Sequence, residues 1–124
     1  ILEHPKGSRL FIEKYNNGVH RLPRMNDYDS YKGFVIEIDQ FDFGHVAHKA
    51  TKLYIVGCTR DQLPSLPPRD MRKATRSICG TYKNGVTLKK RCTQYQREYT
   101  PERLIDWFED VLSVIQDNNY SEEV

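Results

Sequence analysis

The sequence of 124 residues has few of the features that would assign it to a chemical class directly. No apolar run approaches the ~20 residues that a membrane-spanning helix needs, which argues against a helical membrane protein. The three cysteines, Cys58, Cys79 and Cys92, have no CxxC spacing, which argues against a cysteine zinc site and excludes a dense disulfide framework. The seven glycines never gather as GxGxxG or GxxxxGK, and GxSxG is absent, so neither a phosphate-binding loop nor a serine nucleophile is indicated.

A targeting signal is also lacking. The chain starts at Ile1 without methionine or a signal-like apolar stretch, so we expect a removed leader or a segment of a longer protein. The odd number of cysteines favours an intracellular location, cytoplasmic or nuclear. The glycosylation sequon Asn119-Tyr120-Ser121 favours secretion instead, although such a tripeptide often arises by chance.

What is present is an ordinary globular composition, with 29% charged and 38% hydrophobic residues, which argues against a disordered chain. Residues 1–124 suffice for one domain around a single core. Strands are expected at residues 8–15, 19–22, 33–39, 51–58, 77–82 and 86–92. The turns Asn17-Gly18 and Asn84-Gly85 each indicate a hairpin, and the run 51–58, apolar on both faces, indicates a central strand.

Two helices complete the predicted fold. Residues 68–79 are expected to hold a short helix with Pro68 in its first turn. Thr100 and Pro101 are suited to the start of a longer helix over 102–116, whose apolar stripe includes Trp107. The sequence therefore predicts an α+β fold, a mainly antiparallel sheet or partly closed barrel with a C-terminal amphipathic helix packed across it.

The stretch IEIDQFDFGHVAH, residues 36–48, is a possible metal or acid–base site. Glu37 and Asp39 share one face of the predicted strand, and the change of apolar phase after them predicts a bend near Asp39 and Gln40. His45 and His48 are expected to point the same way if GHVAH coils into a turn. These four residues make a metal-dependent hydrolase one hypothesis, but we favour a solvated strand and expect no metal or other cofactor.

The charges are segregated along the chain. Residues 69–103, called the basic block below, carry ten Lys or Arg and three Asp or Glu, whereas residues 104–124 carry six acids and no cation. Cations contact phosphates and aromatic rings stack on bases, so the block predicts binding of RNA or single-stranded DNA, and it would equally suit an anionic lipid headgroup. The candidate binding residues are Arg72, Lys73, Arg76, Tyr82, Lys89, Lys90, Arg91, Tyr95, Arg97 and Tyr99. A merely solvated face is the competing interpretation.

Two further patterns indicate protein partners. PSLPPR, residues 64–69, matches the PxxPxR pattern of ligands for SH3-type grooves, with Arg69 for the acidic rim. A capped amphipathic helix with a central Trp after a run of strands resembles pleckstrin-homology-like domains, which implies an adaptor-like role. An oligonucleotide-binding fold with an appended helix fits the pattern equally, so no family is assigned.

From these observations we expect a non-enzymatic binding domain whose basic block engages an anionic ligand, above all single-stranded RNA. Lys89, Lys90 and Arg91 are expected to contact phosphates, and Tyr82, Tyr95 or Tyr99 to stack on bases. A protein-interaction module is the main alternative.

Overall fold

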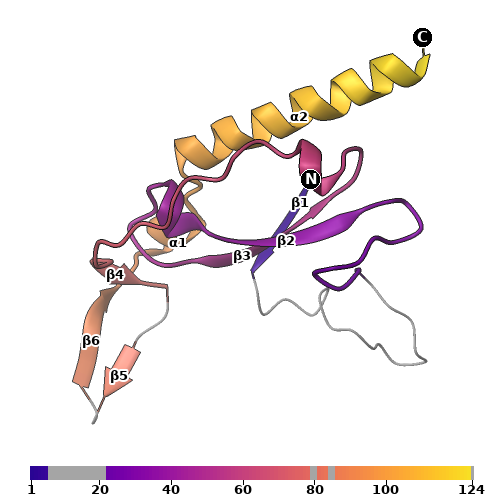
Figure 1. The fold of residues 1–124 in the computed structure, drawn as a ribbon. Helices are drawn as coiled ribbons and strands as arrows, with labels where there is room; N and C mark the ends of the chain where they lie inside the picture. The colour runs from indigo at the N-terminus through magenta and orange to yellow at the C-terminus, as the bar shows by residue number, and fades with distance from the viewer. Residues whose placement is uncertain (6–21, 79–80, 84–85, 124) are drawn as a thin grey trace, which may run out of the picture.

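The structure is a computed structural model that describes residues 1–5, 22–78, 81–83 and 86–123. Over these ranges the strands form two separate sheets, shown with the helices in Figure 1. The elements are β1 (Leu2–Pro5), β2 (Phe34–Asp39), the 3-10 helix η2 (Gln40–Phe43), β3 (Ala50–Ile55), the 3-10 helix η3 (Arg60–Gln62), β4 (Arg76–Ser77), β5 (Thr81–Lys83), β6 (Val86–Arg91), α1 (Gln94–Glu98) and α2 (Glu102–Glu123).

The first sheet, called the large sheet below, is antiparallel with strand order β1-β3-β2. Its register aligns Phe34 with Ile55 and Ile36 with Leu53. Leu53 and Ile55 are fully buried, which explains why β3 is apolar and lies in the centre. The strands predicted at 33–39 and 51–58 are thus confirmed, the second ending at Ile55.

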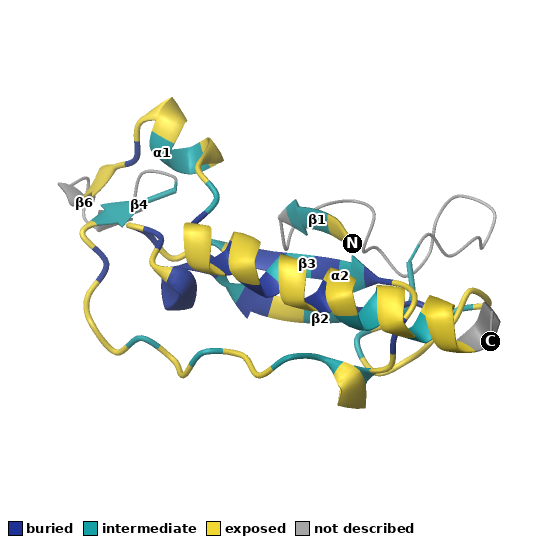
Figure 2. Cartoon of the chain, turned by 90° about the horizontal axis from the view of Figure 1, so that it is seen from above, coloured by how far each residue is buried: buried dark blue, intermediate teal, exposed yellow. Residues whose placement is uncertain are grey.

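Helix α2 covers the large sheet and supplies much of the core. Leu104, Trp107 and Val111 recur every three or four residues and are buried in one cluster with Phe34 and Leu53. Figure 2 shows the buried residues of β2 and β3 beneath α2, whose outer face is exposed. The α+β fold with a C-terminal amphipathic helix is confirmed; over the described residues, its strands form open sheets rather than a barrel.

The bend predicted after β2 is confirmed and takes the form of η2. The Asp39 carboxylate caps this turn by accepting the Phe41 N–H at 3.0 Å. Gly44 ends it with φ 103°, a backbone conformation that side chains disfavour, and donates its N–H to the Phe41 carbonyl at 3.1 Å.

The second sheet, called the small sheet below, has strand order β4-β6-β5. β5 and β6 pair antiparallel, as the hairpin predicted around Asn84-Gly85 requires, whereas that turn itself lies outside the described residues. The helix predicted over 68–79 is wrong, because residues 64–75 are irregular and β4 follows. Asp70 explains part of this result: its N–H donates to the Asp42 carboxylate at 2.9 Å, and its own carboxylate accepts the Arg72 N–H at 3.0 Å, so long-range and turn bonds replace helical ones.

The hairpin predicted around Asn17-Gly18 lies outside the described residues. Strand β1 and helix α1 were not predicted. No helix in the described ranges has the length and apolar character needed to cross a membrane.

Candidate nucleic-acid interface

The small sheet places several candidate binding residues side by side. β4 runs parallel to β6, which aligns Arg76 with Lys90 and Ser77 with Arg91. Lys90 and Arg91 are exposed, and Arg76 is half-buried. Because aligned residues on neighbouring strands lie only about 5 Å apart, Arg76 and Lys90 are close enough to engage one anion.

Two other candidates are located only by their backbone. Tyr82 lies in β5 opposite Thr87, and Lys89 lies in β6 opposite Thr81. Their side chains are outside the described part of the structure, so their contact with a ligand stays a prediction.

Helix α1 presents two tyrosine rings to solvent. Its first turn is closed by a capping box, in which the Thr93 hydroxyl accepts the Gln96 N–H at 3.1 Å and the Gln96 side chain accepts the Thr93 N–H at 2.9 Å. Tyr95 and Tyr99 are four residues apart, and their ring centroids are separated by 6.2 Å. Tyr95 is 76% exposed and Tyr99 is 40% exposed, so a flat base can stack on this pair.

Residues 45–49 connect α1 to the small sheet. The buried His45 ring donates from Nε2 to the Gln96 carbonyl at 2.8 Å, and Lys49 donates from Nζ to the Arg97 carbonyl at 2.7 Å. Ala47 forms an isolated parallel bridge with Arg76 of β4. These contacts connect α1 to the small sheet. The cations and tyrosines of both elements and of the adjoining residues, with Lys73 before β4, are together called the basic surface below: Lys73, Arg76, Lys90, Arg91, Tyr95, Arg97 and Tyr99.

Acidic partners neutralise only part of the basic block. Arg72 pairs with Asp70 at 2.7 Å, and hydrogen bonds from Arg72 lower the pKa of that carboxyl to about 2. Arg69 pairs with the buried Asp42 at 3.2 Å. These two arginines are therefore less available to a ligand. Among the described residues, no acidic partner within ion-pair distance is found for Lys73, Arg76, Lys90 or Arg91.

Arg97 is a half-buried cation of the basic surface. Its Nε atom is buried and has no hydrogen-bond partner among the described residues. A buried donor without an acceptor costs about 1–3 kcal/mol. Because Nε is shielded from solvent, a bound anion could reach only the terminal amino groups of this guanidinium, so Arg97 stays a candidate phosphate contact through its charge alone.

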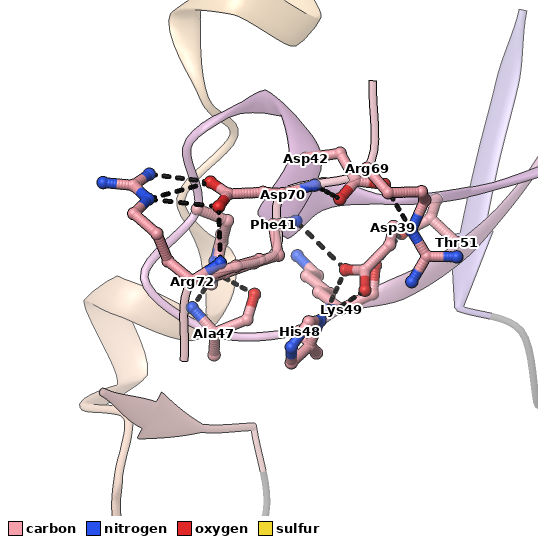
Figure 3. A network of polar contacts seen from close by, with 11 residues as sticks. Asp39, Phe41, Asp42, Ala47, His48, Lys49, Thr51, Arg69, Asp70 and Arg72 are labelled. Carbon is pink, nitrogen blue, oxygen red and sulfur yellow. Dashed lines mark hydrogen bonds and ion pairs between the residues drawn. The ribbon is translucent and has the colours of Figure 1, made fainter. Parts of the chain in front are cut away.

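The carboxylate–histidine stretch forms a separate network, shown in Figure 3. Asp39 accepts hydrogen bonds from His48 Nδ1 at 2.6 Å and from the N–H groups of Phe41 and Lys49 at 3.0 and 2.9 Å. Burial alone would raise the pKa of Asp39, but these hydrogen bonds outweigh it and hold the pKa below its usual value. Asp39 is therefore ionised at neutral pH.

The four residues of the metal hypothesis do not come together in the way that a metal site would require. His45 is buried against Gln96 and Ala47, whereas His48 is exposed beside Asp39, so residues 44–48 do not form the turn that would point both histidines the same way. The cause is that His45 is held by α1, a helix that the sequence pattern did not reveal. In the ranges that the structure covers, no three His, Cys, Asp or Glu side chains are grouped to hold a metal ion.

The proline segment is engaged by the rest of the fold. The Pro64 carbonyl accepts the Trp107 indole N–H at 3.3 Å, Pro67 is half-buried, and Arg69 pairs with Asp42. An SH3-type groove would need both of these prolines and this arginine. PSLPPR must therefore leave its present contacts before it can act as such a ligand.

A cavity of about 520 Å³ lies away from the basic surface and was missed by sequence reasoning. Its lining includes Tyr28, Tyr31, Cys58 and Asn118, from segments far apart in the sequence, so no local motif could have revealed it. Burial raises the pKa of the Cys58 thiol, which keeps it in the less reactive protonated form. Cys58 and Cys92 are both free and buried.

The geometry thus leaves the basic surface as the strongest candidate site. Comparison of the chain with protein-family models, with curated proteins and with solved structures finds no match, so this candidate rests on the residues themselves.

Proposed function

We propose that this chain binds single-stranded RNA through the basic surface. The observation that carries the proposal is the exposed pair Tyr95 and Tyr99, joined through residues 45–49 to a small sheet in which Arg76, Lys90 and Arg91 have no acidic partner among the described residues. Stacking of a base on an aromatic ring contributes about 1–3 kcal/mol, and unpaired cations add phosphate contacts. Neither feature alone would favour nucleic acid over another anion.

The arrangement suggests a division of roles. Lys90 and Arg91 contact the phosphates, and the two exposed tyrosines receive unstacked bases. Duplexes keep their bases stacked, so the tyrosine pair favours single strands. The acids of α2 lie on a helix that extends away from α1 (Figure 1), which reduces their repulsion of the strand.

The proposal is tested by titrating the protein with labelled single-stranded RNA, duplex RNA and anionic liposomes, each at two salt concentrations. We expect the single strand to bind most tightly, with a log–log salt slope of about −0.7 for each phosphate contacted. Preference for liposomes would instead assign the basic surface to lipid headgroups. If all three ligands bound equally weakly, the basic surface would be a solvated face without a specific ligand.

Variants locate the interface in the same assay. Lys90→Ala combined with Arg91→Ala should weaken binding and make the salt slope shallower. Tyr95→Ala should weaken binding with little change of slope, because it removes stacking without removing charge. Lys32→Asn is a matched control: Lys32 lines the distant cavity and has φ 59°, which Asn tolerates. This variant should bind almost as the wild type does.

A protein-binding role is the second candidate, favoured by the outer face of α2. Ile105 and Leu112 are seven residues apart and are 43% and 48% exposed, on a helix whose charged residues beyond Arg103 are all acidic. A partner with a basic and apolar surface would fit there. Binding that survives loss of Lys90 and Arg91 but is lost in Leu112→Asp would support this alternative.

A further inference from the structure

The exposed His48 is held in one orientation by its neighbours. Its Nδ1 lies 2.6 Å from Asp39 Oδ2, and its ring packs on Phe41 with centroids 4.4 Å apart. Asp39 is itself held by two backbone N–H groups, as Figure 3 shows. The imidazole is nevertheless 47% exposed. A surface histidine fixed in this way has lost rotational freedom while keeping access to a ligand.

The contact with Asp39 also determines which ring nitrogen of His48 carries the hydrogen. An ionised carboxylate only accepts hydrogen bonds, so Nδ1 must carry the hydrogen between the two groups. In the neutral ring the lone pair is then on Nε2. Nε2 makes no hydrogen bond with the residues that the structure describes. This arrangement of carboxylate, imidazole and open Nε2 is the one a general base requires.

His48 also lies beside the basic surface. Ala47, the residue before it, bridges to Arg76, and the next residue of β4, Ser77, pairs with Arg91. Continued by one residue, this register would bring the His48 Cα level with those of Ser77 and Arg91, about 10 Å from the Arg91 Cα across two strand spacings. Lys49, on the other side of His48, bonds to α1. A strand bound along the basic surface passes within reach of His48.

We propose that His48 is a general base that cleaves RNA held on the basic surface. In this step His48 Nε2 takes the proton of a ribose 2′-hydroxyl, and the 2′ oxygen forms a bond to the adjacent phosphorus. The bond from phosphorus to the 5′ oxygen breaks, and that oxygen takes a proton from water. The hydroxide so formed recovers the proton from His48, so the products are a 2′,3′-cyclic phosphate and a free 5′-hydroxyl.

The roles of the neighbours follow from the geometry. Arg91 neutralises charge that develops on the phosphate, as a cation at a phosphoryl group does. Asp39 is a positioning residue, because among the described residues its carboxylate bonds to His48 and to the N–H groups of Phe41 and Lys49. This activity rests on the proposed RNA binding, which supplies the substrate.

The test uses an end-labelled RNA oligomer and its 2′-deoxy counterpart, with EDTA present, and identifies the products by mass spectrometry. We expect slow cleavage of the RNA to a cyclic phosphate and none of the deoxy strand. His48→Gln should reduce the rate about 10²- to 10⁴-fold without weakening binding, which is measured in parallel by fluorescence anisotropy. His48→Ala should regain part of its rate when imidazole is added, which a merely structural role would not produce.

Two further variants complete the design. Asp39→Asn should lower kcat about tenfold or more while KM changes little, because the ring keeps its place but loses its tautomer. His4→Gln, a histidine in β1, is the matched control and should cleave as the wild type does. Thermal unfolding confirms that each variant is folded.

Several outcomes would overturn the inference. These are no cleavage by the wild type, equal cleavage by His48→Gln, cleavage of the deoxy strand, or loss of activity in EDTA. RNA that binds but is not cleaved leaves the proposed binding function intact. RNA that does not bind removes the binding function as well.

Discussion

The indole N–H of Trp107 donates to the carbonyl of Pro64 at 3.3 Å, which joins the buried face of α2 to the proline segment. Trp107 is only 5% exposed, and its ring meets those of Phe43 and Phe108 at centroid distances of 6.4 and 6.1 Å. One side chain therefore anchors both the core and the long connection between the two sheets.

Replacement of this side chain should be costly. Trp107→Ala leaves a large cavity and should lower the free energy of unfolding by about 3–5 kcal/mol, measured by urea denaturation. Ile105→Ala, on the exposed side of the same helix, should change it by no more than about 0.5 kcal/mol. Near wild-type stability of Trp107→Ala would contradict the placement of this ring in the core.

Two glycines allow the cost of a strained backbone to be separated from the cost of a clash. Gly44 and Gly57 have φ 103° and 107°, but a Cβ at Gly44 meets nothing within 4 Å, whereas one at Gly57 lies 2.8 Å from Ile115 Cγ2. Gly44→Ala should therefore cost about 1–2 kcal/mol from strain alone. Gly57→Ala should cost about 1–3 kcal/mol more, because overpacking is added. If urea denaturation gave the same loss of unfolding free energy for both variants, the Ile115 side chain would have moved aside at no cost.

The Tyr54 hydroxyl donates to the Asp29 carboxylate and should give the fold an alkaline limit. Burial, and then the hydrogen bond to Asp29, raise the pKa of Tyr54 to about 12. The unfolded value is about 10, so this stabilisation is complete below pH ~10 and is lost as the pH rises towards about 12. When tyrosinate absorbance is followed as the pH rises, Tyr54→Phe should remove the step at about pH 12. Asp29→Asn should shift that step to lower pH; an unchanged step would contradict the assignment.

If the basic surface binds RNA, the ion pair between Arg72 and Asp70 should weaken that binding. Asp70→Asn releases Arg72 and removes a negative charge beside the surface. The salt slope for single-stranded RNA should then steepen by about 0.7, the value for one phosphate contact. Asp61→Asn, in η3, makes the same change of charge at an exposed position outside the surface and should leave the slope unchanged. A similar gain in both variants would indicate a response to net charge alone.

The elements that the sequence predicted are those defined by a local pattern. Alternation identified β2, an apolar run identified β3, and the stripe through Leu104 and Trp107 identified α2. Each pattern reflects burial against a neighbour and needs no knowledge of that neighbour's position. Helix α2 nevertheless continues to Glu123, beyond the predicted end at residue 116, because the polar residues that follow include no glycine or proline to end it.

The elements that were missed or wrong depend on contacts distant in sequence. The helix predicted over 68–79 does not form, and the Asp70 N–H donates to the Asp42 carboxylate instead. Helix α1 has a recognisable capping box at Thr93 and Gln96, but with only five residues it lacks an apolar stripe. The separation of His45 from His48 followed from that helix. The residues proposed for the basic surface could thus be named from the sequence, whereas helix α1 and the contacts of residues 45–49 could not.

The unequal cores of the two sheets have a consequence for how the molecule opens. The described hydrophobic core is built from β2, β3, η2, Cys58 and α2, and of the small-sheet side chains that the structure describes, none belongs to it. That sheet is attached to residues 45–49 through the isolated bridge between Ala47 and Arg76. Amide protons of β4 and β6 should therefore exchange with solvent through local opening, at a lower free energy than those of β3. The part of the chain proposed to meet the ligand can come apart and re-form while the rest stays folded.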